Sequence, residues 1–124
     1  MTDEPRSYDR EFTTPLGYRT RRRIGYSHAQ GEVTRFVVQL EYRLGDEWAE
    51  VVRFDHDPAG EQGHDVTVDG VHMDVYRDGE KIRSPEVFPP MAASDALTSA
   101  EEHLTQYGKR YVTRFEEWHG IRHR

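Results

Sequence analysis

The chain has 124 residues, of which 35% are hydrophobic and 32% charged, with a formal net charge of −6 and no cysteine. This length suits a single domain with a modest core, and the missing cysteines exclude disulfides, a thiolate nucleophile and thiolate metal sites. No segment reaches the ~20 apolar residues of a membrane span, and the first residues lack a signal-peptide pattern. We therefore expect a cytoplasmic protein that does not interact with membranes.

The charged residues are biased in type, because 23 are Asp or Glu whereas Lys81 and Lys109 are the only lysines beside the arginines. An acidic, lysine-poor surface is typical of proteins from high-salt cells. It equally suits an ordinary domain that its net charge keeps soluble. Composition leaves both interpretations open.

Residues 1–16 are polar without an apolar period, which predicts a flexible leader before a single domain at residues 17–121. In residues 17–29, tyrosine and isoleucine alternate with arginine, which predicts an edge strand carrying a basic stripe. Residues 33–44 alternate more clearly and predict a strand with one apolar face. A tight turn at Gly45-Asp46 predicts that the next strand, ending at Asp55, pairs with it as a hairpin.

The middle of the chain is rich in turn residues. Residues 56–63 predict a loop. Asp69-Gly70 and Asp78-Gly79 then predict two tight hairpin turns that join short strands at 64–68, 71–77 and 80–84. In this register Val75 lies opposite Ile82 on the apolar face.

The last third of the chain changes from strand to helix periodicity. Prolines 85, 89 and 90 end the sheet because proline cannot donate to a strand ladder. Ser94 is the predicted N-cap of a helix that runs to about His119, with large apolar side chains along one stripe. The sequence thus predicts an α+β fold, in which an antiparallel sheet of five to six strands packs against one long C-terminal helix.

Reactive side chains concentrate between residues 53 and 83. Histidine exchanges protons near neutral pH, carboxylates orient it, and arginine binds phosphate with paired hydrogen bonds. We expect either of two histidines to handle a proton, either of two aspartates to orient it, and either of two arginines to neutralise phosphate. These candidate catalytic residues are His64, His72, Asp55, Asp74, Arg53 and Arg83. A solvated polar sheet face is the alternative interpretation.

The same imidazoles and carboxylates also form a ligand set for a divalent metal. No fixed-spacing signature such as H-E-x-x-H occurs in the chain. The sequence analysis therefore assigns no metal and no cofactor.

Arg19, Arg21 and Arg23, with His56, are candidate binding residues for a nucleic-acid backbone. The alternative is an edge strand whose charges prevent aggregation. The net negative charge argues against strong nonspecific binding to nucleic acid.

The run Arg53-Phe54-Asp55-His56, the segment Gly63-His64-Asp65 and the prolines before the helix resemble TumE-type toxins of toxin–antitoxin pairs. That resemblance implies a protein that acts on RNA and is held by an antitoxin-like protein partner. His56 stands where the family has asparagine, and the family's adjacent histidines are reduced to His64.

Residues 63–66 and 72–79 also resemble small uncharacterised proteins of halophilic archaea, a likeness that implies no activity. The leading hypothesis from the sequence is a toxin-like ribonuclease that uses the His, Asp and Arg side chains of the sheet. The alternative is a noncatalytic protein-interaction module. The oligomeric state is left open.

Overall fold

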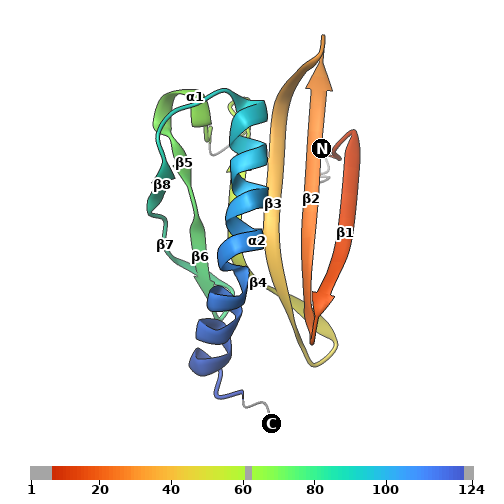
Figure 1. Cartoon of the computed structure of the whole chain (residues 1–124), viewed down its shortest axis with the longest axis vertical. Helices are drawn as coiled ribbons and strands as arrows, with labels where there is room; N and C mark the ends of the chain where they lie inside the picture. Colours follow the sequence, from red (N-terminus) through yellow and green to blue (C-terminus); the bar gives the residue numbers. More distant parts are fainter. Residues whose placement is uncertain (1–6, 61–62, 122–124) are drawn as a thin grey trace, which may run out of the picture.

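The computed structural model describes residues 7–60 and 63–121 of the chain. Six antiparallel strands form one sheet in the order β1-β2-β3-β4-β6-β7, and the long helix α2 crosses one face of it (Figure 1). Strands β5 and β8 form a separate two-stranded ribbon. The predicted α+β fold is confirmed. In chain order the elements are β1 (Arg10–Gly17), β2 (Thr20–Ala29), β3 (Glu32–Leu44), β4 (Glu47–His56), α1 (Val66–Asp69), β5 (Val71–His72), β6 (Asp74–Arg77), β7 (Glu80–Arg83), β8 (Glu86–Phe88) and α2 (Ala93–Trp118).

The hydrophobic core lies between α2 and the face of the sheet that it covers, which we call the inner face. Alternation on β3 places Phe36, Val38, Leu40 and Tyr42 on this face, and all four are buried. Gly108 of α2 lies directly above the sheet, where an added Cβ would be 4.0 Å from a methyl group of Leu40. An alanine at this position would therefore make an ordinary van der Waals contact with β3.

Helix α2 is the long helix expected from the spacing of its apolar residues. It begins two residues earlier than predicted, since Ala92 is its N-cap and Ser94 is its second residue. The backbone N–H of Met91 donates to the carbonyl of Val66, which fixes the path of the chain before the helix without a side-chain cap. Within the described residues, no helix is both long enough and apolar enough to cross a membrane.

The predicted leader is wrong for residues 10–16, because they form β1 at the edge of the sheet. All residues of β1 are exposed, so burial imposes no apolar period on this strand, and an edge strand tolerates Pro15. The ring of Tyr8 lies beside Gly25, where an added Cβ would come within 2.7 Å of it. The domain therefore begins before residue 17, and the rest of the predicted leader, residues 1–6, lies outside the described residues.

The predicted strand at 64–68 and the hairpin at Asp69-Gly70 are also wrong. Asp65 caps a short helix, α1, by accepting a hydrogen bond from the backbone N–H of Thr67 at 2.9 Å. Gly70 has a positive φ of 81° and ends this helix. The Asp65 side chain bonds the nearby backbone, so this segment forms a helical turn and not a strand.

The second predicted turn is confirmed, because Asp78 and Gly79 both have positive φ, and β6 pairs with β7 across them. The register contains a bulge that the sequence analysis did not predict. Tyr76 lies opposite Lys81, but Val75 lies opposite Arg83 in place of Ile82. Ile82 is consequently exposed.

Candidate functional site

Buried polar side chains gather on the outer face of the sheet, the side opposite α2. Gln39 and Glu41 alternate on β3 with the core residues, and both are buried. The Glu41 carboxylate accepts hydrogen bonds from Arg21 Nε at 2.6 Å and from Gln39 Nε2 at 2.5 Å. The Arg21 guanidinium also lies 4.0 Å from the centroid of the Trp48 ring. Among the described residues, Gln39 Oε1 is buried without a hydrogen-bond partner, so the Glu41 carboxylate is bonded from two sides whereas Gln39 is only partly satisfied.

Three potential ligands of a cation meet further along the outer face, and we call them the Asp55–His64–Asp74 cluster. One ligand atom from each residue lies within 4.8 Å of the other two. His64 Nδ1 is 2.8 Å from Asp55 Oδ1. The Asp74 side chain has only 3% of its surface exposed. Two carboxylates and one imidazole form a mixed oxygen and nitrogen ligand set that suits a divalent transition metal.

The cluster is assembled by strand pairing and by one tied loop. Arg53 of β4 lies opposite Asp74 of β6, and Asp55 is on the same side of β4 as Arg53. His64 comes from the loop after β4, which closes where the N–H of Asp57 donates to the His64 carbonyl at 2.8 Å. Gly63, with a φ of 63°, turns the chain back just before His64.

Three neighbouring groups partly offset the negative charge of the two carboxylates. Arg53 Nε is 3.2 Å from Asp55 Oδ2, and Lys81 Nζ is 3.6 Å from Asp74 Oδ2. Ser84 Oγ donates to Asp74 Oδ1 at 2.5 Å. The structure thus brings together Arg53, Asp55, His64 and Asp74 of the predicted set.

A cavity of about 340 Å³ opens beside this cluster. Asp55 and His64 line it together with residues of α1 and its flanks, namely Asp65, Val66, Asp69, Gly70 and His72. Three aspartates in one wall repel a bare phosphate and attract a cation. Phosphate chemistry in this cavity is therefore more favourable with a bound divalent cation than without one.

His72 lines the same cavity, but the backbone engages both of its ring nitrogens. Nδ1 is 3.0 Å from the carbonyl oxygen of Ser84, and Nε2 is 3.0 Å from that of Asp69. Both nitrogens donate only in the protonated ring, so the Ser84 carbonyl raises the pKa of His72, with a smaller contribution from the Asp69 carbonyl and an opposing one from desolvation. His72 ties α1 to the segment after β7, which leaves neither nitrogen ready to exchange a proton with substrate.

His56 points into the core, away from the cluster and from solvent. Its ring stacks on Phe36 with centroids 5.8 Å apart, and its Nδ1 accepts a hydrogen bond from the N–H of Val66 at 3.1 Å. Burial lowers the pKa of His56, so the ring is neutral near pH 7. The residue positions α1 and offers nothing to a nucleic acid, which corrects its assignment as a binding residue.

Arg83 lies on the inner face, because the bulge pairs it with the core residue Val75. It therefore does not join the Asp55–His64–Asp74 cluster as the sequence analysis expected. Its charge instead acts on Arg114 of α2, whose pKa is lowered first by desolvation and then by Arg83. The bulge at Ile82 therefore puts Arg83 on the face opposite to that of Arg53.

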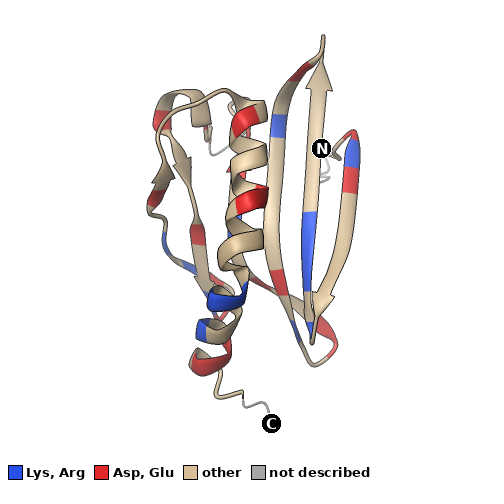
Figure 2. Cartoon of the chain, viewed as in Figure 1, with Lys and Arg blue, Asp and Glu red and all other residues tan. Residues whose placement is uncertain are grey.

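The arginines of the predicted basic stripe have other partners. Strand β2 is not an edge, since β1 pairs with it on the side opposite β3. Arg21 contacts Glu41, and Arg23 Nε is 3.7 Å from Glu11 Oε1 on β1. Arg19 lies in the turn before β2, where its Nε donates to Tyr18 Oη. Figure 2 shows basic and acidic segments interspersed over the strands and α2, so this view has no uniformly basic surface.

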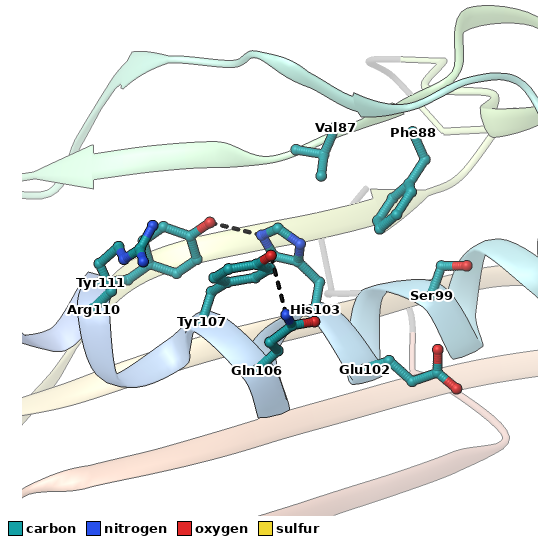
Figure 3. A pocket seen from close by; sticks show the side chains of 9 residues that line it. All are labelled: Val87, Phe88, Ser99, Glu102, His103, Gln106, Tyr107, Arg110 and Tyr111. Atoms are coloured by element: carbon teal, nitrogen blue, oxygen red, sulfur yellow. Dashed lines mark hydrogen bonds between the residues drawn. The ribbon is translucent and has the colours of Figure 1, made fainter.

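A second cavity, of about 550 Å³, lies between β8 and α2 and was missed by the sequence analysis. His103, Tyr107 and Tyr111 stand in a row along α2 and face Val87 and Phe88 of β8 (Figure 3). His103 Nε2 is 2.6 Å from the Tyr111 hydroxyl. These three α2 residues are four positions apart in the sequence, but apolar residues that face a core are spaced in the same way, so the spacing alone does not indicate a cavity.

No curated protein and no solved structure matches the chain. A family model described as "Domain of unknown function (DUF7718)" matches residues 5–121, which include β1 and every other element of the fold. The chain therefore belongs to the family of this domain of unknown function.

Proposed function

We propose that the protein binds one divalent transition-metal cation at the Asp55–His64–Asp74 cluster and uses it to hydrolyse phosphodiester bonds in RNA. The observation that carries the proposal is the convergence of three ligand atoms within 4.8 Å of one another, from two strands and a tied loop. The proposal includes the action on RNA that the resemblance to TumE-type toxins implies.

The electrostatics of the cluster favour a cation. Two carboxylates at this distance repel each other, and Asp74 is nearly out of contact with water. Arg53 and Lys81 each contact one carboxylate from the side, at 3.2 and 3.6 Å. Asp55, Asp74 and His64 would hold a divalent cation here, and its charge would relieve the remaining repulsion.

The chain supplies three ligands, which leaves coordination positions for a water molecule and a phosphate oxygen. A bound divalent cation lowers the pKa of such a water and stabilises charge on phosphorus. Arg53 lies beside Asp55 at the edge of the cluster, where its remaining N–H groups are available to a phosphate oxygen. Water adds to phosphorus, the ester oxygen leaves, and that oxygen takes the proton that the water loses.

Cation binding is tested by calorimetric titration of untagged protein with Mn²⁺ and Zn²⁺. We expect one site per chain, and Asp74→Asn and His64→Gln should each weaken it by roughly a hundredfold. Asp69→Asn is the matched control, because Asp69 lines the same cavity outside the cluster. Equal losses in Asp69→Asn and Asp74→Asn, or no binding to the wild type, overturn the site.

Activity is tested by incubating the wild type and Asp74→Asn with total RNA, with and without EDTA. The proposal requires cleavage that EDTA abolishes, that Mn²⁺ or Zn²⁺ restores, and that Asp74→Asn loses. Cleavage that persists in EDTA overturns the role of the cation. In that case His64, oriented by Asp55, is the residue that transfers the proton. Intact RNA under all conditions overturns the hydrolase.

A second candidate function is a noncatalytic interaction module, and one observation favours it. A groove of about 500 Å³ runs between α2 and the strands that α2 leaves uncovered, β1 and β2 (Figure 1). Leu16 and Tyr18 are exposed large hydrophobic residues in its wall, and Arg22 and Lys109 add positive charge. An acidic amphipathic helix of an antitoxin-like protein partner fits this combination.

This second function is tested by co-expression with the product of the neighbouring gene. A complex that Leu16→Glu disrupts, and that Lys109→Glu and Arg22→Glu weaken with the folded state intact, supports the groove as its binding site. A complex that is indifferent to all three substitutions, or no complex, argues against it.

A further inference from the structure

The cavity between β8 and α2 has aromatic walls and polar edges. Phe88 comes from β8, whereas His103, Tyr107 and Tyr111 follow one another on α2 at intervals of four residues (Figure 3). The ring of His103 meets those of Phe88 and Tyr107 at centroid distances of 5.8 and 4.8 Å. Its volume of about 550 Å³ lies within the range of small-ligand sites. Flat apolar walls of this kind accept a planar ring.

His103 presents one polar atom to this cavity. Burial lowers the pKa of His103 and raises that of Tyr111, so at neutral pH the ring is neutral and the phenol keeps its proton. We assign the Tyr111 hydroxyl as the donor to His103 Nε2, at 2.6 Å, which places the ring proton on Nδ1. In Figure 3 this second nitrogen is on the side of the ring toward Phe88. The cavity therefore contains a fixed hydrogen-bond donor.

Arg110 is the one arginine among the described residues in the lining of the cavity, and Arg114 and Arg83 lie outside that lining, beyond Tyr111. Arg110 lines the cavity and lies over the Tyr107 ring at 5.4 Å, and Arg114, one helical turn later, lies over the Tyr111 ring at 5.2 Å. Within the described residues, Nε and Nη2 of Arg114 are buried without a hydrogen-bond partner. Arg83 adds a further positive charge that acts on Arg114. Buried, unsatisfied guanidinium atoms beside like charges indicate a site for an anion.

An aromatic slot, the His103 donor and the nearby arginines point to one ligand class, with Ser99, Glu102 and Gln106 as the other polar residues of the lining. A quaternary ammonium ion would suit the aromatic rings, but the arginines repel it. A fatty acid would leave the His103 donor unpaired. A planar heterocycle joined to a phosphate satisfies all three features, because its ring stacks, a ring acceptor receives the His103 proton, and its phosphate contacts guanidinium groups.

We propose that this cavity binds one nucleotide, with its base between Phe88 and Tyr107 and its phosphate at Arg110, Arg114 and Arg83. The site lies on the inner side of the sheet and is separate from the Asp55–His64–Asp74 cluster. The nucleotide belongs either to an RNA chain or to a free mononucleotide pool, which present the same chemistry to these residues.

The test is a titration of the full-length protein in EDTA, so that the outcome does not depend on the proposed cation. The probes are the four ribonucleoside 5′-monophosphates, their nucleosides and ribose 5-phosphate, followed by changes in the NMR signals of His103 and Tyr107. We expect at least one monophosphate to bind about tenfold more tightly than its nucleoside and than ribose 5-phosphate. A short single-stranded RNA that binds more tightly than any monophosphate identifies RNA as the source, whereas weaker binding identifies the free nucleotide.

Matched variants locate the phosphate. Arg110→Gln should weaken monophosphate binding about tenfold, whereas Arg10→Gln, which removes an exposed charge of β1 outside the cavity, should leave it unchanged. Equal losses in the two variants indicate a general charge effect and overturn the site. Ribose 5-phosphate binding as tightly as every monophosphate overturns the base slot. Unchanged signals of His103 and Tyr107 with all probes overturn the proposal as a whole.

Discussion

On the outer face of the sheet, Arg21 and Arg53 each contact a carboxylate, whereas on the inner face Arg83 and Arg114 lie near each other without one among the described residues. The outer arginines are ion-paired within the fold, and they support a cluster whose excess charge is negative. The inner arginines are available to an external anion. The two faces of one sheet therefore carry local charges of opposite sign, which a net charge of −6 for the whole chain does not indicate.

The largest expected effect concerns the buried carboxylate on the outer face. Glu41→Ala removes the common acceptor of Arg21 and Gln39 and leaves one part-buried and one buried donor without it. We expect the free energy of unfolding to fall by about 2–3 kcal/mol, which is below the value for a fully buried pair because Arg21 keeps 29% of its side chain exposed. Urea denaturation checks this. Glu50→Ala, at the register partner of Glu41, is the control and should cost less than about 0.5 kcal/mol.

A substitution on the inner face should instead raise the free energy of unfolding. Arg114→Met replaces a desolvated, unpaired cation by an apolar side chain of similar length, so we expect stability to rise by about 0.5–1 kcal/mol in nucleotide-free buffer. The same denaturation measurement applies, with Arg110→Met as the exposed comparison. A loss of stability larger than that of Arg110→Met would show that the contacts of Arg114 with the Tyr111 and Trp118 rings outweigh its desolvation.

Smaller effects appear in the pH dependence of stability, again with opposite signs. The pKa of His103 is lowered by burial, so the unfolded chain binds a proton more readily than the folded one. Its contribution to stability is present above the unfolded pKa of about 6.5 and is lost as the pH falls through the folded pKa. The stability difference between wild type and His103→Gln should therefore shrink on acidification from pH 7. A difference that is constant with pH contradicts a buried neutral imidazole.

His72 should behave in the reverse way. Its pKa is raised because the Ser84 and Asp69 carbonyls accept from the protonated ring. That stabilisation is fully present below pH ~6.5 and is lost as the pH rises through the higher folded pKa. The stability advantage of wild type over His72→Gln should thus be largest in mild acid and decline toward pH 8. An advantage that grows with pH contradicts the two-carbonyl arrangement.

The sequence predicted those parts of the fold in which burial imposes a period or a turn imposes a backbone conformation. Strand β3, helix α2 and the Asp78-Gly79 turn are of this kind. Strand β1 escaped prediction because it is exposed on both sides, and the Asp69-Gly70 hairpin failed because the Asp65 side chain captures the backbone of Thr67. A hydrogen bond between a side chain and the nearby backbone does not alter the hydrophobic pattern, so the pattern could not predict it.

The candidate site was likewise predicted only in part. Composition singled out Arg53, Asp55, His64 and Asp74 as one reactive stretch, but the pairing of β4 with β6 and the loop closure that bring them together are not encoded by any periodicity. Arg83 was misplaced by the bulge at Ile82. His103 received no role, because the cavity that it lines forms only when β8 packs against α2.

The bulge in β7 also decides which face each cation of this strand occupies. Residues two positions apart in a regular strand share a face, but the extra residue at Ile82 places Lys81 beside the cluster on the outer face and Arg83 opposite the core residue Val75. Deleting Ile82 would make Lys81 and Arg83 consecutive and leave them on opposite faces. Straightening the strand with Ile82 kept would instead bring Arg83 opposite Asp74, so the bulge keeps a second positive charge away from the Asp55–His64–Asp74 cluster.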